Sequence, residues 1–221
     1  MIKYLICAFL LCQYTLNGMG ERERFFTDIY DNRGWGANEE GVGYSGMGST
    51  LQHATPYVQI LEFFIKTHNI DTIVDVGCGD WTLSRHIDFG NAHYSGYDTV
   101  AGLIQKNKEK FSSDKITFHH ADVIDFDLPK ADLLICKDVL QHLSNEDVVI
   151  FLKQLPKFKY CLITNDVDSR TLTSQNSQIS GDYRNIDLTA PPFNIKGVKA
   201  LTFRSGYVTK QVLYINRTNN D

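Results

Sequence analysis

The most constraining feature of the sequence is a glycine-rich turn, Val74-Asp75-Val76-Gly77-Cys78-Gly79-Asp80, which ends an apolar run of β-branched residues. Glycine lets the backbone turn tightly and approach a ligand closely. We expect a helix over about residues 81–87, directly after the turn. The N-terminus of such a helix offers unpaired N–H groups to a ligand. This order of strand, turn and helix predicts a ligand site inside an α/β domain.

Strand-like and helix-like segments alternate along the chain. We expect helices at 25–30, from Thr55-Pro56 to about 68, at 100–111 and from Ser144 or Asn145 to 155. We expect strands at 72–76, 94–97, 116–118, 132–136, 160–164, 200–203 and 211–215, with a long loop over 166–190. The alternation indicates a doubly wound, mostly parallel sheet. Ser205-Gly206 makes the last connection too short for a parallel crossover, so the last two strands must be antiparallel.

An acidic residue, Asp98, ends the strand that follows the glycine turn. Because ligands of open α/β sheets bind at the carboxyl ends of the strands, Asp98 is expected beside that turn. A carboxylate there can accept hydrogen bonds from both ribose hydroxyls of an adenosine. The alternative is a tight turn and a surface acid that bind nothing. A dinucleotide site prefers G-x-G-x-x-G, and Thr82 at the third glycine position disfavours NAD.

The D-x-G-x-G pattern of Asp75, Gly77 and Gly79 resembles the first motif of class I S-adenosylmethionine (SAM)-dependent methyltransferases. The resemblance extends from Asp71 to about Ile215 and includes residues 120–123, residues 132–143 and the late hairpin. It implies a Rossmann-like, seven-stranded sheet, mostly parallel with an antiparallel C-terminal strand, and SAM across the strand ends. It also divides the chain into a lid and helix at 19–70 and a methyltransferase domain at 71–221.

Residues flanking these motifs resemble a bacterial-type subgroup of uncharacterised methyltransferases. The similar segments are 26–36, 45–49 and 182–193. This second resemblance implies no particular acceptor for the methyl group.

The family resemblance assigns roles around the methionine and ribose parts of SAM. Gly77 and Gly79 would leave room for both parts. Asp75 would help to orient the methionine amino group through water, and the carbonyl of Lys137 would accept from the same group. Asp98 would bind the ribose hydroxyls.

Three further residues are implied around the cofactor. Asp122 would accept a hydrogen bond from the adenine amino group. The backbone of Val123 would contact the ring, and Trp81 would form a wall of the site.

Methyl transfer depends mainly on positioning, because the sulfonium already activates the methyl group. A hydroxyl or amine acceptor can also need a base within hydrogen-bond reach. His142, in the turn after the fourth expected strand, is the first candidate, and Asp138 is the second. Each has a plain alternative as a residue that packs or caps, and the resemblance does not decide.

The polar, glycine-rich segment 21–50 is expected to form a lid. Ser45, Ser49, Thr50 or Arg33 within it are candidates for binding the methionine carboxylate, and the alternative is a solvated loop. Residues 166–193 are expected to form the other wall of the acceptor pocket, with 190–193 as a rigid loop.

The charge composition and the histidine spacing restrict the classes of partner that the protein can bind. With 22 Lys and Arg against 26 Asp and Glu, the net charge of −4 disfavours nucleic acid as substrate. His119 and His120 lack a third metal ligand at a sensible spacing, so no metal is expected. The expected partner is a small-molecule acceptor.

Residues 1–18 have two interpretations. Lys3 and the apolar run that follows resemble a signal peptide, which would make the protein secreted or extracytoplasmic, although the run is too short for a membrane span. Alternatively they are an upstream extension and the protein is cytoplasmic. Cys78, Cys136 and Cys161 favour a reducing compartment, because they read as buried free thiols.

Three hypotheses for the function follow. The first is a methyltransferase that moves a methyl group from SAM to an oxygen or nitrogen of a small-molecule or saccharide-like acceptor. The second is a protein of the same fold that binds SAM or a partner without turnover. The third is an NAD-dependent oxidoreductase, which Thr82 disfavours.

Overall fold

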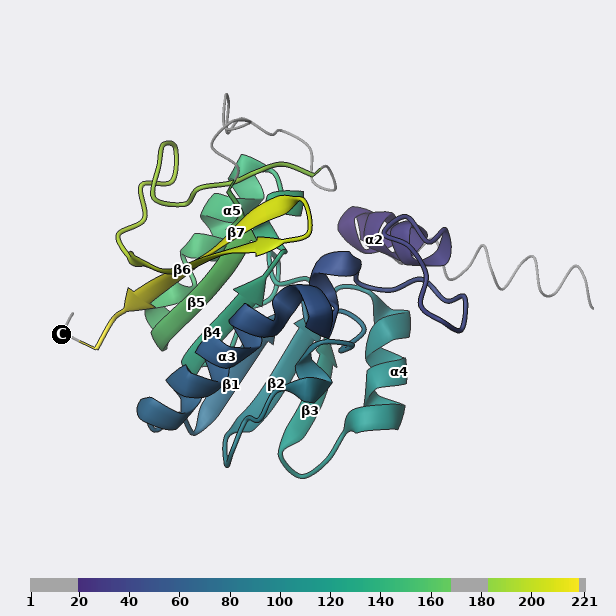
Figure 1. Ribbon diagram of the computed structural model, residues 1–221, viewed down its shortest axis with the longest axis horizontal. Helices are drawn as coiled ribbons and strands as arrows, with labels where there is room; N and C mark the ends of the chain where they lie inside the picture. The colour runs from purple at the N-terminus through teal and green to yellow at the C-terminus, as the bar shows by residue number, and fades with distance from the viewer. Residues whose placement is uncertain (1–19, 168–182, 219–221) are drawn as a thin grey trace, which may run out of the picture.

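The computed structural model describes residues 20–167 and 183–218. Seven strands form one sheet in the order β3-β2-β1-β4-β5-β7-β6 (Figure 1). The first five strands are parallel, and β7 runs antiparallel to both β5 and β6. The strands are β1 Thr72–Val76, β2 His93–Asp98, β3 Ile116–His120, β4 Ala131–Lys137, β5 Phe158–Asp166, β6 Val198–Ser205 and β7 Val208–Asn216. The doubly wound sheet with a reversed C-terminal strand is therefore confirmed.

Helices cover both faces of this sheet (Figure 1). The helices that cover the faces are α3 Leu51–Thr67, α4 Ala101–Phe111 and α5 Asn145–Leu152, whereas α2 Glu21–Asp31 lies at one end of the sheet. Side chains of α3 and α4 share one apolar cluster with Ile73, Leu133 and Ile135 of the sheet. The side chains of α5 pack in the other cluster, with Val74 and Leu134. Residues that alternate along β1 and β4 thus point to opposite covered faces, which explains their continuous apolar runs.

Helix α3 begins earlier than the sequence predicts. It starts at Leu51, and Pro56 lies inside it. The expectation of a start at Thr55-Pro56 is therefore wrong. Pro56 is the sixth residue of α3, so it leaves the carbonyl of Gln52 without the N–H that a regular helix would supply. The hydroxyl of Thr55 donates to the carbonyl of Leu51 one turn back, so this threonine bonds within the helix instead of capping it.

No α-helix follows the glycine turn, which corrects the expectation for 81–87. Only a 3-10 turn at Ser84–His86 forms there. The backbone of Trp81 has φ 57°, a left-handed conformation that a right-handed helix excludes. The side chain of Asp80 accepts from the N–H of Thr82. The ligand-binding character of this turn must therefore come from its glycines and side chains.

The N-terminal segment lies over the carboxyl ends of the parallel strands. Figure 1 shows α2 above this end of the sheet, beside the loop that leads into α3. In this loop, a 3-10 turn at Met47–Ser49 precedes α3 directly. Within residues 20–167 and 183–218, no helix is long and apolar enough to cross a membrane.

Candidate functional site

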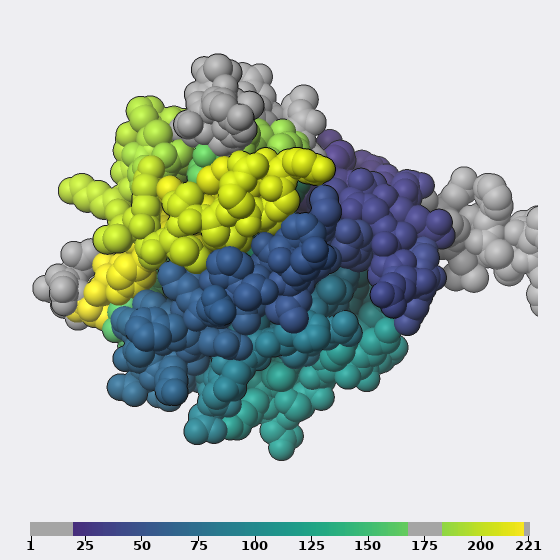
Figure 2. All heavy atoms as spheres, in the orientation of Figure 1, coloured from purple at the N-terminus to yellow at the C-terminus, as the bar shows by residue number. Residues whose placement is uncertain are grey.

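A cavity of about 400 Å³ lies at the carboxyl ends of the strands, beneath the N-terminal segment. Its walls come from α2 and residues 45–49, from the glycine turn, from the ends of β2, β4 and β5, and from the β6–β7 hairpin. Figure 2 shows the N-terminal segment, in purple and dark blue, packed against this yellow hairpin. Residues of the expected lid segment 21–50 thus line the cavity, and their action as a lid stays a prediction.

Two glycines shape the floor of the cavity. Gly77 and Gly79 have φ values of 70° and 57°, which favour glycine. A Cβ on Gly77 would lie 2.3 Å from Cγ2 of Val139, and a Cβ on Gly79 would lie 2.4 Å from Oγ of Ser45. Both positions therefore need glycine for space as well as for backbone conformation.

Asp98 lies beside the glycine turn, as expected. Its Oδ2 accepts from the N–H of Gly79 and its Oδ1 from the N–H of Val100, each at 2.9 Å. Burial raises the pKa of this carboxyl, and the two N–H groups oppose the rise. Each carboxylate oxygen has a second lone pair. Asp98 can thus hold the turn and still accept from a ligand in the cavity that it lines.

A small second cavity of about 40 Å³ adjoins the glycine turn and contains the carboxyl of Asp75. Burial raises the pKa of Asp75 to about 7. A hydrogen bond from the hydroxyl of Tyr94, at 2.6 Å, opposes this rise. Ser45 and Ser49 line both cavities. The Oγ of Ser45 donates to Asp80 at 2.8 Å, which fastens the N-terminal segment to the turn.

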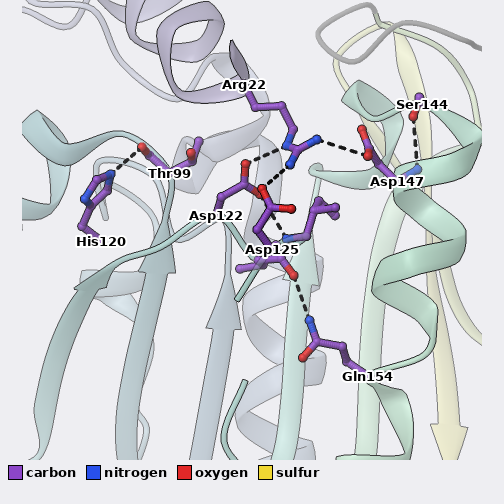
Figure 3. A network of polar contacts seen from close by, with 10 residues as sticks. Arg22, Thr99, His120, Asp122, Asp125, Ser144, Asp147 and Gln154 are labelled. Carbon is purple, nitrogen blue, oxygen red and sulfur yellow. Dashed lines mark hydrogen bonds and ion pairs between the residues drawn. The ribbon is translucent and has the colours of Figure 1, made fainter. Parts of the chain in front are cut away.

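Arg22 of α2 reaches across the cavity edge to three carboxylates (Figure 3). Its guanidinium contacts Oδ2 of Asp122 at 2.6 Å, Oδ2 of Asp125 at 2.7 Å and Oδ1 of Asp147 at 3.2 Å. The other oxygen of Asp122 accepts from the N–H of Ile124. Asp122 and Val123 line the cavity, and their contact with an adenine stays a prediction. Arg22, which occupies Oδ2 of Asp122, was not predicted from the sequence.

Four charged side chains, two buried and two half-buried, lie at the ends of β4 and β5 and on β7. The Nζ of Lys210 donates to Asp138 at 2.8 Å and to Asp166 at 2.7 Å. The Nζ of Lys137 contacts Asp138 and the carbonyl of Gly48. Burial opposes ionisation of Asp138, but the two lysines outweigh it and lower the pKa of this carboxyl. A carboxylate held ionised in this way is a weak base, which argues against Asp138 as the proton acceptor.

His142 lies in the 3-10 turn Leu140–His142 and lines the cavity, as expected. Aromatic rings surround it: the ring centroids of Trp35, Tyr183 and Phe26 lie 5.3, 6.0 and 6.4 Å away. Its role as a base stays a prediction. The cluster of rings gives the upper wall of the cavity an apolar, aromatic character.

Three expected site residues lie elsewhere. Trp81 is 5% exposed and packs against Phe111 and Phe118 in the core, so it does not wall either cavity. Arg33 is exposed and lines neither cavity. The hydroxyl of Thr50 is directed to the carbonyl of Met47 and the ring of His53, and Thr50 lines neither cavity.

The adjacent histidines have separate structural contacts. The ring of His119 stacks on Tyr97, with 4.7 Å between centroids. His120 pairs with Glu23 and with the carbonyl of Thr99. Across the described parts of the chain, no group of His, Cys, Asp and Glu side chains is arranged to hold a metal ion.

Comparisons with known proteins identify the fold. Residues 73–158 match the family model described as a methyltransferase domain. Magnesium protoporphyrin IX methyltransferase from Synechocystis PCC 6803, solved with bound S-adenosylhomocysteine (SAH), is 15% identical with a TM-score of 0.63. This match covers 90% of this chain and 100% of that one. No curated protein matches the sequence.

Two other solved structures share the fold. The N-methyltransferase NodS from Bradyrhizobium japonicum WM9, in complex with SAH, is 11% identical with a TM-score of 0.63, over 86% of this chain and 99% of that one. Human N-acetylserotonin methyltransferase, in complex with SAM, is 15% identical with a TM-score of 0.54, over 96% of this chain and 66% of that one. The chain therefore shares the fold of these methyltransferases.

Proposed function

We propose that this protein transfers a methyl group from SAM to an oxygen or nitrogen of a small-molecule acceptor, a saccharide-like compound included. The observation that carries the proposal is the convergence of the glycine turn, Asp98 and Asp122 on one cavity. The cavity measures about 400 Å³, the lower part of the range of ligand pockets. Its glycine floor and its carboxylates suit the adenosine and methionine parts of SAM.

SAM would supply a methyl group that its sulfonium already activates. Asp98 would bind the ribose, and Asp122 would accept from the adenine amino group beside the backbone of Val123. The carbonyl of Lys137 would accept from the amino group at the other end, and the carboxyl of Asp75 would help to orient this group through water. Positioning of this kind can supply about 7–11 kcal/mol of rate enhancement.

The acceptor would enter between the N-terminal segment and the β6–β7 hairpin. Aromatic rings at Trp35, His142 and Tyr183 line this part of the cavity, with the charges of Asp138 and Lys210 beneath. The neighbouring structures include methyltransferases for a porphyrin and for N-acetylserotonin, both small molecules. These features support a small-molecule acceptor.

The two other functions differ in their ligands. An NAD-dependent oxidoreductase would bind NAD, which Thr82 in place of the third glycine disfavours. A binding protein without turnover would bind SAM and release no SAH in the presence of any acceptor.

The proposal is tested by incubating the full chain with methyl-labelled SAM and a panel of phenols, amines and methyl glycosides. Mass spectrometry detects SAH together with the methylated product. Asp98→Ala should weaken SAH binding by ~1–3 kcal/mol, because a charge-assisted hydrogen bond to the ribose is lost. Asp114→Ala, an exposed carboxylate, is the matched control. Unchanged affinity in Asp98→Ala, or a folded protein that forms no product with any acceptor, would contradict the proposal.

The compartment is a separate proposal. We propose that the protein is cytoplasmic if residues 1–18 are retained and extracytoplasmic if they are removed. These residues lie outside the described part of the chain. N-terminal sequencing of the native protein decides between the two outcomes.

A further inference from the structure

His53, in the first turn of α3, lines the cavity on the acceptor side. Its Nδ1 lies 2.9 Å from Oγ1 of Thr50. The same Oγ1 lies 2.9 Å from the carbonyl of Met47, which can only accept. A hydroxyl has one proton. Thr50 therefore donates to Met47 and accepts from His53, which places the ring proton on Nδ1 and leaves a lone pair on Nε2.

The Nε2 of His53 faces the turn of the β6–β7 hairpin. It lies 3.7 Å from the point that a Cβ on Gly206 would occupy. The neighbouring residue, Ser205, is 5% exposed and lines the same cavity. Its Oγ has no hydrogen-bond partner among the described residues. A buried hydroxyl without a partner is costly, so this one points to a ligand group that supplies the missing bond.

The register of the β6–β7 hairpin places a positive charge, that of Lys210, on the same face as Ser205. Ser205 pairs with Val208, and Phe203 pairs with Lys210. Residues opposite each other in antiparallel strands share a face, as do residues two apart along one strand. Ser205 and Lys210 thus lie on one face, and both line the cavity. Of the three N–H groups of the ammonium, two bond Asp138 and Asp166.

We propose that His53, Ser205 and Lys210 form the subsite for an acceptor hydroxyl and that His53 is its general base. The inference rests on the proposed function and adds the acceptor atom. One proton acceptor beside two donors matches a hydroxyl, which gives up a proton while its oxygen gains negative charge. A protonated amine needs hydrogen-bond acceptors, whereas Ser205 and Lys210 would offer it donors. His53 thus takes the role that the sequence suggested for His142.

The atoms balance without a further reagent. The acceptor oxygen forms a bond to the methyl carbon as the sulfur–methyl bond breaks, and that electron pair stays on sulfur. The hydroxyl proton passes to Nε2 of His53. The resulting imidazolium keeps its Nδ1–H bond to Thr50, which in turn donates to Met47.

The first test needs no acceptor. A long-range ¹⁵N–¹H NMR spectrum of ¹⁵N-histidine-labelled protein with SAH shows which nitrogen of each neutral ring carries a proton. The signal of His53 is assigned by its absence in His53→Gln. We expect the proton on Nδ1, and in Thr50→Val, which removes its acceptor, a shift toward Nε2. A proton on Nε2 in the unmodified protein would overturn the proposal.

The second test measures methyl transfer to phenol, 4-nitrophenol and methyl glucoside at a pH where only 4-nitrophenol is ionised. General-base catalysis contributes typically 10²–10⁴-fold. His53→Gln should therefore slow transfer to the un-ionised hydroxyls by about 100-fold or more and leave the 4-nitrophenolate rate within a few-fold. Ser205→Ala should raise KM for the hydroxyl probes. His93→Gln, an exposed histidine at the start of β2, is the control.

The outcomes separate the two proposals. If His53→Gln slows methyl transfer equally for ionised and un-ionised probes, then His53 is a packing residue and not a base. Methylation of aniline with none of the hydroxyl probes would overturn the hydroxyl subsite and leave the methyltransferase intact. Failure to bind SAH by folded protein would overturn the proposed function itself.

Discussion

Replacing Arg22 by glutamine tests whether α2 is a lid held closed by charge. Arg22 contacts Asp122, Asp125 and Asp147. The side chain of Asp125 is 76% exposed, so its contact contributes little. Those of Asp122 and Asp147 are 24% and 13% exposed. At roughly 0.5–1 kcal/mol for each of these two pairs, the three contacts together hold α2 with about 1–2 kcal/mol.

That energy limits how far the variant can shift SAH binding, because a lid changes affinity by no more than its own closing free energy. We expect the Kd for SAH, measured by calorimetry, to rise about 5–30-fold in Arg22→Gln. Arg24→Gln on the exposed side of the same helix is the matched control and should change nothing. The difference between the two variants should shrink at high salt, because ion pairs are screened.

The same experiment has a result that refutes this reasoning. If Arg22 competes with the adenine amino group for Asp122, then removing it frees the carboxylate. Arg22→Gln would then bind SAH more tightly than the unmodified protein. An unchanged Kd would show that α2 plays no part in cofactor binding.

Three other substitutions test single features of the site. Asp75 has a raised pKa, so its ionisation favours the unfolded chain as pH rises. Asp75→Asn should therefore gain stability relative to the unmodified protein between about pH 4 and 7, in urea unfolding, and gain nothing further above that range. Lys210→Met leaves Asp138 and Asp166 without this partner and should lower the free energy of unfolding by about 3–5 kcal/mol. A loss below 1 kcal/mol would show that Lys137 and water satisfy these carboxylates. His142→Phe keeps a ring among Phe26, Trp35 and Tyr183 and should retain both SAH affinity and turnover, whereas a loss of turnover alone would make His142 the base.

The sheet and the position of the ligand site at its strand ends could be predicted from the sequence, because both depend on local patterns. Apolar runs such as 132–136 mark strands buried on both faces. The position of Asp98 at a strand end then follows from parallel topology alone. These arguments need no knowledge of which side chains meet across the fold.

Other features depend on contacts between distant residues. Arg22 is 100 residues from Asp122, and Lys210 is 72 from Asp138. No rule of sequence spacing predicts contacts between residues so far apart, so neither pair could be predicted from the sequence. His53 was missed for the same reason, since its significance lies in Thr50 on one side and in the hairpin on the other.

Local rules failed where tertiary packing overrides them. Trp81 was expected in the ligand site because it follows the glycine turn. Its ring instead fills the core between Phe111 and Phe118, and the backbone takes φ 57° to place it there. That conformation also excludes Trp81 from a right-handed helix, and only a 3-10 turn forms after it, at Ser84–His86.

The central claim is that the cavity at the strand ends binds SAM. Calorimetric titration of the full chain with SAH and with NAD tests it most directly. We predict binding of one SAH per chain and none of NAD, with a thermal stabilisation of ~2.7 kcal/mol when SAH is present at 100 times its Kd. A folded protein that binds NAD, or that binds neither ligand, would contradict the claim.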